Sequence, residues 1–214
     1  MESPNGTATI VAPVKRGRPV KAKAPAVEEI KIPPLQIETF KLKLVGDSPL
    51  IVHAWSKKAK EQMLAKQMKK ATMAKEAKDP QRDYQESLYH LEGGGYGFPA
   101  IGFKAAAVNA CSSVEGITKV QARGAFHIVG EMVKIEGTPA MREDMVRIGM
   151  GVADIRYRGE FKEWQATLTV RHNARVLSAS QIINLFNVAG FAVGLGEWRP
   201  GRDGSYGLFH VEQA

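Results

Sequence analysis

The sequence lacks several features that would place it in familiar classes of protein. Cys111 is the only cysteine among the 214 residues, which excludes an intrachain disulfide and favours a reducing compartment. No apolar run reaches the roughly 18 residues of a membrane-spanning helix. The N-terminal residues also lack the apolar stretch of a secretory signal. We therefore expect a cytoplasmic protein without a membrane partner.

Motifs of common enzymes and metal centres are also missing. We find no pair of carboxylates, no His-Glu-x-x-His, no Gly-x-Ser-x-Gly and no phosphate-loop lysine. The histidines are scattered without the spacing of metal ligands, at His53, His90, His127, His172 and His210. We expect neither enzyme activity nor a metal or other cofactor.

The composition is that of a globular chain with an excess of positive charge. With 44% hydrophobic and 24% charged residues, the chain is long enough for one good core. The formal net charge of +8 favours a polyanionic partner.

Residues 1–34 combine Pro, Ala, Gly and Lys without a hydrophobic period, which predicts a disordered basic tail. Residues 14–23, Val-Lys-Arg-Gly-Arg-Pro-Val-Lys-Ala-Lys, resemble an AT-hook. The resemblance implies that Arg16 and Arg18 enter the narrow minor groove of A·T-rich DNA, where negative potential is concentrated. The alternative is an electrostatic tail without sequence preference.

The first half of the remaining chain shows strand, turn and helix patterns. Residues 36–45 alternate apolar and polar side chains as a half-buried strand does, and residues 50–55 return an apolar stretch. From Ser56, a predicted N-cap, to Lys78 the composition is helical, and Asp79-Pro80 would end that helix. Its lysines are either a solvated face or phosphate contacts, the candidates being Lys58, Lys66, Lys69 and Lys70.

The second half completes the pattern of a split βαβ fold. We expect a helix over residues 99–114, a strand broken near Gly130, a strand over 162–171, a helix over 181–189 capped by Ser178 or Ser180, and a closing strand over 206–211. This order predicts an α+β fold over residues 35–214: a ferredoxin-like antiparallel sheet with helices on one face. Insertions are expected at about residues 80–98 and 139–159, the first carrying Tyr96 and Phe98 as candidate base-stacking side chains.

The stretch from Gly190 to Phe209 is the strongest candidate for a binding site. Glycine amides approach a ligand closely, and nests of them bind phosphate, which makes Gly194, Gly196 and Gly201 candidates. Trp198 and Tyr206 could stack on bases, while Arg199 and Arg202 could contact phosphates. The alternative is a flexible connection with Trp198 packed on the core.

With this glycine-rich stretch between the last helix and the last strand, residues 35–214 resemble the RAMP superfamily of CRISPR-associated proteins. The resemblance implies a ferredoxin-like core and subunits that polymerise along single-stranded RNA with the help of their insertions. Gly194-Leu195-Gly196 matches the family's loop, whereas Gly204-Ser205-Tyr206-Gly207 is not the second Gly-x-Gly usual in its processing enzymes.

A second resemblance is to an uncharacterised family of tailed-phage proteins. It rests on the segments around residues 50–67, 152–156 and 194–200. This resemblance implies a gene near phage replication and recombination functions, and the cytoplasm of a bacterial host as the site of action.

These features together predict a non-enzymatic protein that binds single-stranded nucleic acid, with DNA favoured over RNA. We expect it to be phage-encoded, to assemble along the strand as a homo-oligomer or filament, and to act in replication or recombination, including strand annealing. One alternative, implied by the RAMP resemblance, is an endoribonuclease in which His53 is the general base for a 2′-hydroxyl. Another is a phage assembly or scaffolding protein whose tail neutralises DNA.

Overall fold

The structure is a computed structural model that describes residues 32–69, 77–148 and 151–212. Leu35–Ala214 forms a compact unit separate from Met1–Pro34, and it holds every helix and strand discussed below. The AT-hook-like segment with Arg16 and Arg18, and also Lys70, lie outside the described residues. None of the described helices is long and apolar enough to cross a membrane.

Nine strands and five α-helices are formed by the described residues. The strands are β1 (Ile37–Gly46), β2 (Leu50–Val52), β3 (Tyr96–Pro99), β4 (Phe126–Ile128), β5 (Met132–Glu136), β6 (Pro139–Ile148), β7 (Val152–Phe161), β8 (Gln165–Asn173) and β9 (Phe209–Val211). The helices are α1 (Lys57–Gln67), α2 (Pro80–Ser87), α3 (Ala100–Ala110), α4 (Lys119–Ala125) and α5 (Ala179–Ala192).

The main sheet has the strand order β3-β5-β8-β1-β9, and β4 also pairs with β8. All of its pairs are antiparallel. Since β4 and β5 both pair with β8, they are the two halves of the strand predicted to break near Gly130. If β4 and β5 are counted as one strand, the core has four strands, which follow along the chain as β1, β4–β5, β8 and β9. Across the sheet they lie in the order β9, β1, β8, β4–β5, that is 4-1-3-2, which is the antiparallel ferredoxin-like arrangement. The predicted α+β fold class is confirmed.

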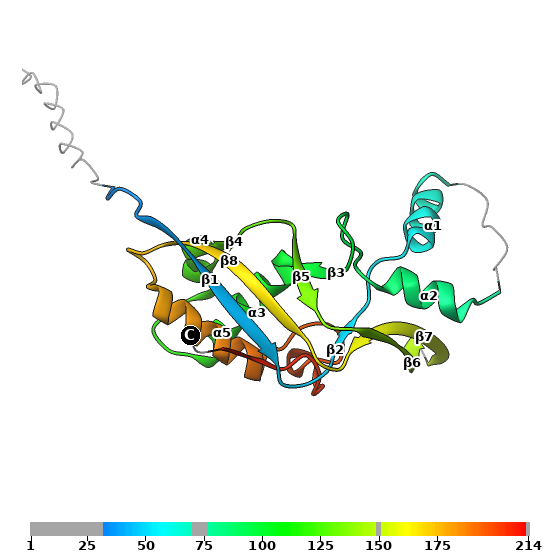
Figure 1. Cartoon of the computed structure of the whole chain (residues 1–214). Coiled ribbons are helices and arrows are strands. Elements are labelled where there is room, and N and C mark those ends of the chain that lie inside the picture. The colour runs from blue at the N-terminus through cyan, green and yellow to red at the C-terminus, as the bar shows by residue number, and fades with distance from the viewer. Residues whose placement is uncertain (1–31, 70–76, 149–150, 213–214) are drawn as a thin grey trace, which may run out of the picture. The chain divides into compact units, whose positions relative to one another are not determined.

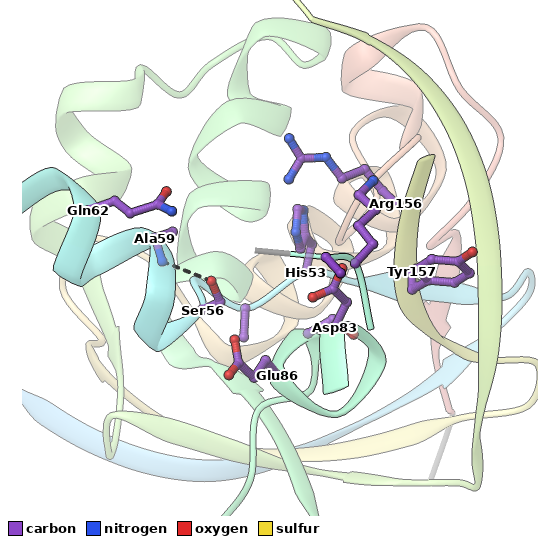
Figure 2. Close-up of a pocket in the computed structure, with 12 residues that line it drawn as sticks. His53, Ser56, Ala59, Gln62, Asp83, Glu86, Arg156 and Tyr157 are labelled. Carbon is purple, nitrogen blue, oxygen red and sulfur yellow. Dashed lines mark hydrogen bonds between the residues drawn. The ribbon is translucent and has the colours of Figure 1, made fainter. Parts of the chain in front are cut away.

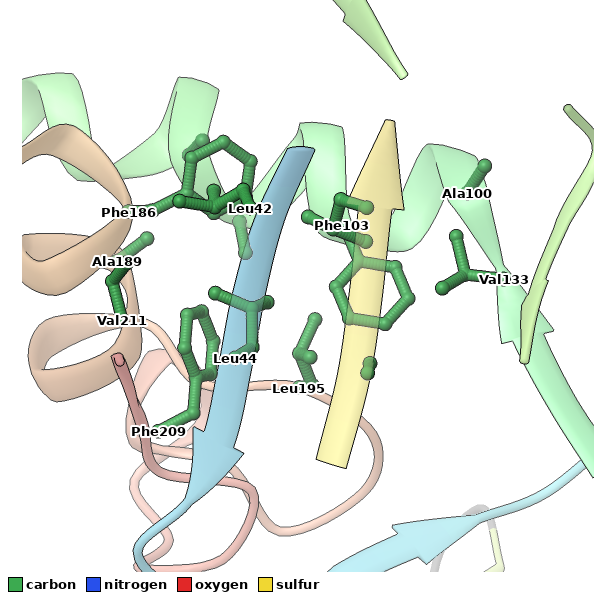
Figure 3. Close-up of a cluster of buried hydrophobic side chains, with 14 of the residues drawn as sticks. Leu42, Leu44, Ala100, Phe103, Val133, Phe186, Ala189, Leu195, Phe209 and Val211 are labelled. Atoms are coloured by element: carbon green, nitrogen blue, oxygen red, sulfur yellow. The ribbon is translucent and has the colours of Figure 1, made fainter. Parts of the chain in front are cut away.

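The core lies between this sheet and α3 and α5, which cover one of its faces (Figure 1). Leu42 and Leu44 of β1 alternate with exposed or half-exposed side chains, as a sheet with one covered face requires. Figure 3 shows them facing Phe186 and Ala189 of α5, with Leu195 from the glycine-rich stretch in the same cluster. The glycine-rich stretch is therefore anchored in the core by an apolar side chain.

A second sheet, β2-β7-β6, is dominated by a long hairpin. β6 and β7 pair over their whole length, from Pro139 opposite Phe161 to Ile148 opposite Val152. This hairpin occupies the region of the predicted second insertion. α2 packs on it: Ser87 Oγ accepts a hydrogen bond from the Gly159 amide at 2.9 Å, and Tyr84 donates to the Pro139 carbonyl at 3.1 Å.

Several predicted boundaries were wrong. The helix from Ser56 does begin there, with the Ala59 amide donating to Ser56 Oγ, but α1 ends at Gln67 instead of continuing to Lys78. Asp79-Pro80 starts a helix instead of ending one, because Asp79 caps α2 and the fixed φ of Pro80 suits the first helical position. The strand predicted from residue 162 begins at Gln165, and the closing strand begins at Phe209.

Two further elements differ from the sequence prediction. α4, which begins with a capping box of Thr118 and Gln121, was not predicted. The region predicted as the first insertion contains α2 and then β3, and β3 pairs with β5 as a strand of the main sheet.

Candidate nucleic-acid interface

The glycine-rich stretch folds back onto β2 through its own backbone. The Glu197 amide donates to the Ile51 carbonyl at 2.9 Å, and the Gly207 amide donates to the Pro49 carbonyl at 2.8 Å. Within the stretch, the Leu195 amide donates to the Gly207 carbonyl at 2.9 Å. These bonds fix the loop at the point where the main sheet passes into the second sheet.

The loop glycines are explained by close packing. A Cβ on Gly196 would overlap the Ile51 carbonyl oxygen, and one on Gly204 would overlap the Trp198 carbonyl oxygen. The amides of Gly194, Gly201, Gly204 and Gly207 all donate to protein carbonyls. The predicted nest of amides is therefore not free to bind phosphate at these four glycines.

The two loop arginines have different surroundings. Arg199 is partly buried and its Nη1 donates to the Gly196 carbonyl at 2.6 Å, so it holds the loop in shape. Arg202 ends a short 3₁₀ turn, Pro200–Arg202, and its side chain is exposed. Of the pair, Arg202 is the better placed to meet a phosphate.

The two loop aromatics stack on arginines of the β6–β7 hairpin. The Arg142 guanidinium lies 4.7 Å from the Tyr206 ring centroid and donates to the Tyr206 hydroxyl at 3.4 Å. The Arg158 guanidinium lies 5.9 Å from the centroid of Trp198, whose side chain remains 41% exposed. Trp198 is therefore half-exposed, and its ring lies over the buried Arg158.

An ion-pair network joins the hairpin arginines. Arg142 pairs with Asp144 at 2.8 Å and with Glu160 at 2.7 Å, and Arg158 pairs with Asp144 at 3.2 Å. Burial of the Asp144 carboxyl raises its pKa, but hydrogen bonds from Arg142 and Arg158, together with their charges, outweigh burial and lower it. This network stiffens the hairpin beneath the loop.

Arg158 keeps an unused donor. It is only 7% exposed, and its Nε has no hydrogen-bond partner in the described part of the chain. A buried donor without a partner is costly.

His53, directly after β2, lies in the same neighbourhood. Desolvation by the surrounding protein lowers the pKa of His53, and the positive charges of Arg158 and Arg156 lower it further, while Glu197 acts in the opposite direction. Arg156 of β7 is half-exposed and pairs with Asp154 at 2.9 Å. We call His53, Arg156, Arg158 and Trp198 the junction site.

The other predicted contacts lie elsewhere. Tyr96 packs its ring 5.9 Å from Phe161, and Phe98 packs 5.6 Å from Phe103, so both rings serve the core. Lys66 and Lys69 are exposed on and just after α1, and the structure does not describe the side chain of Lys58. The junction site thus unites Trp198 and His53 from the predicted set and leaves Tyr96 and Phe98 apart.

Arg142, Arg156 and Arg158 were not among the predicted site residues. Their signal was spacing: Arg142 and Asp144 on one strand, and Asp154, Arg156, Arg158 and Glu160 on the other, recur at every second residue. A period of two places each set on one face of a strand. Because Arg142 lies opposite Arg158 in the hairpin register, both sets of charged side chains lie on the same face of the hairpin.

A cavity of about 240 Å³ opens beside the junction site, and His53 and Arg156 line it. Within the described residues, no group of three or more His, Cys, Asp or Glu side chains could hold a metal ion.

Comparison with known proteins does not assign a family. No protein-family model matches the sequence, and no curated protein matches it. Among solved structures, the fold is similar to the crystal structure of Cmr6 from Pyrococcus furiosus, with 8% sequence identity, a TM-score of 0.42, and coverage of 84% of this chain and 100% of that one. A similarity at this level carries no argument about function.

Proposed function

We propose that this protein binds single-stranded nucleic acid at the junction site. The observation that carries the proposal is the half-exposed ring of Trp198 over the buried Arg158, whose Nε has no partner among the described residues, with the half-exposed Arg156 nearby. Trp198 stacks on one base, the buried Arg158 supports the ring from beneath, and Arg156 holds an adjoining phosphate.

The geometry favours a single strand over a duplex. A base can stack on Trp198 only if its own face is free, as it is in single strands, and such stacking contributes roughly 1–3 kcal/mol per base. The formal net charge of +8 supplies the general attraction for a phosphate backbone. Arg202 of the loop and Lys66 and Lys69 beside α1 are exposed and add contacts along the strand.

The finer parts of the proposal rest on the sequence resemblances. We propose that copies of the chain assemble along the strand, that DNA is preferred to RNA, and that the protein is phage-encoded and acts in replication or recombination. Annealing of complementary strands would follow if two coated strands could meet.

The test is binding of a fluorescently labelled single-stranded oligonucleotide across a salt series. We expect Trp198→Ala to weaken binding by roughly 5- to 150-fold, the equivalent of one stacked base. Arg156→Ala should lower the salt slope by about 0.7, the value for one phosphate contact on a single strand. Arg147→Ala is the matched control, since Arg147 is exposed at a register position facing away from Arg142 and Asp144 on the same strand. Equal affinities for all four proteins, each folded by circular dichroism, would remove the junction site from the proposal.

A second candidate function is RNA cleavage with His53 as general base. The observation that favours it is the lowered pKa of His53, because a general base must be unprotonated at the working pH. This candidate requires that the protein cut a labelled RNA, leave the matching DNA intact, and lose the cleavage in His53→Ala. An uncut RNA would leave binding as the function.

A further inference from the structure

The cavity beside the junction site is walled by three elements. The N-cap residue Ser56 and Gln62 in the middle of α1 line it, α2 contributes Asp83 and Glu86, and β7 contributes Arg156. Its volume of about 240 Å³ is below the roughly 300–1,000 Å³ of pockets for drug-sized ligands. Figure 2 shows Arg156 beside His53, and Asp83 and Glu86 approaching from α2. Because His53 and Arg156 also belong to the junction site, a strand bound there passes the mouth of this cavity.

The carboxylates of Asp83 and Glu86 decide which kind of ligand the cavity can bind. Both side chains are half-buried, and neither carboxylate makes a hydrogen bond or an ion pair with another described residue. The nearby Lys78 does not neutralise them, since its Nζ pairs with Asp154 at 2.5 Å and donates to the Ile155 carbonyl. Two partly desolvated acceptors without donors favour a ligand that supplies N–H groups.

The same carboxylates exclude a phosphate from the cavity, because like charges repel at close range. A neutral group rich in N–H donors fits instead. The other lining residues can bind acceptor atoms on the opposite edge of such a ligand. Arg156 is a donor, and the Gln62 amide both donates and accepts. The Ser56 hydroxyl keeps a proton to donate while its oxygen accepts from the Ala59 amide.

We propose that the cavity binds one unstacked guanine base of the nucleic acid strand, a proposal that rests on the proposed function. Guanine presents two neighbouring donor groups, N1–H and N2–H₂, to a carboxylate, and its O6 and N7 accept from arginine. Uracil and thymine have a single N–H and would leave a carboxylate unpaired. The protein therefore prefers a strand with a guanine at one position, while the backbone and Trp198 contacts stay indifferent to sequence.

The experiment compares full-length protein binding to a 12-nucleotide oligothymidylate and to the same oligonucleotide with one central guanine, adenine or cytosine, and repeats the set in oligouridylate. We expect the guanine-containing strand to bind roughly tenfold more tightly than the parent, within the range for one bidentate base contact. Glu86→Gln should remove this preference and leave affinity for the parent strand unchanged. Glu92→Gln, at an exposed residue that does not line the cavity, should keep the preference.

The outcomes separate the two proposals. Equal binding of all strands would overturn the guanine site and leave the proposed function intact. A preference for adenine or cytosine over guanine, or a guanine preference that survives in both Glu86→Gln and Asp83→Asn, would overturn it as well. No binding of any strand would overturn the proposed function, and the guanine site with it.

Discussion

Gly196 has no room for a side chain, and its backbone is in a conformation that favours glycine. Its φ is +71°, and a Cβ would overlap the Ile51 carbonyl oxygen. The residue is therefore the place where the loop makes its closest approach to β2. Because Trp198 lies two residues further on, the position of the stacking ring depends on this backbone contact.

We expect Gly196→Ala to lower the free energy of unfolding by roughly 1–3 kcal/mol, through the left-handed φ and the overlap with Ile51. Urea denaturation measures the change. Gly124→Ala is the control, because Gly124 lies in α4 with open space around its Cα and alanine there should stabilise by about 0.5–1 kcal/mol. A Gly196→Ala protein as stable as wild type would show that the loop does not pack on β2 as described.

At the scale of elements, the β6–β7 hairpin is stabilised by ion pairs between its strands, whereas a sheet in a core is stabilised by apolar contacts. Asp144 is nearly buried and holds both Arg142 and Arg158. Removing one partner of a buried pair is costly because the other charge stays desolvated. Asp144 therefore fixes the two arginines on which the rings of Trp198 and Tyr206 lie.

Asp144→Asn should lower the free energy of unfolding at pH 7 by roughly 3–5 kcal/mol. The folded pKa of Asp144 is lowered, so its stabilisation is present above the unfolded value of about 3.9 and is lost as the pH falls through the folded pKa. Wild type and variant should thus differ at pH 7 and converge in strongly acidic solution. Urea unfolding at a series of pH values tests this, with the exposed Asp203→Asn as control. A difference that stays constant down to pH 2 would contradict the role given to Asp144.

At the scale of the whole molecule, positive charge is divided between the N-terminal residues and the folded unit. The residues before Leu35 carry Lys15, Arg16, Arg18, Lys21, Lys23 and Lys31, whereas the junction site lies wholly in Leu35–Ala214. The two parts can be separated experimentally, because the second forms a compact unit by itself.

We expect residues 35–214 to keep most of the single-strand affinity of the full chain and to lose part of its salt dependence, since fewer cations displace counterions. Salt-series binding to single- and double-stranded oligonucleotides measures both, and electron microscopy of the bound fraction tests for filaments. If binding vanished with the first 34 residues, the scaffolding alternative, in which only the tail meets DNA, would replace the junction site.

Part of the fold was predictable because it depends on local patterns. The alternation in residues 36–45 and 162–171 located β1 and β8, and Ser178 was correctly among the predicted caps of α5. α4 was missed because a seven-residue helix has too few turns to show a period. Asp79-Pro80 was misjudged because the same dipeptide can follow one helix or begin the next.

The sequence by itself determined the fold class and the basic character, and it singled out residues 190–209 as a candidate site, since hydrophobic period, net charge and glycine content can be read without the tertiary structure. Only the tertiary structure decided which distant residues that stretch contacts. It showed that the Glu197 amide bonds to Ile51 of β2, that Trp198 lies over Arg158, and that His53 and Arg156 line the same cavity. These contacts join residues up to about 150 positions apart, and no local pattern encodes which distant strand a loop will cross.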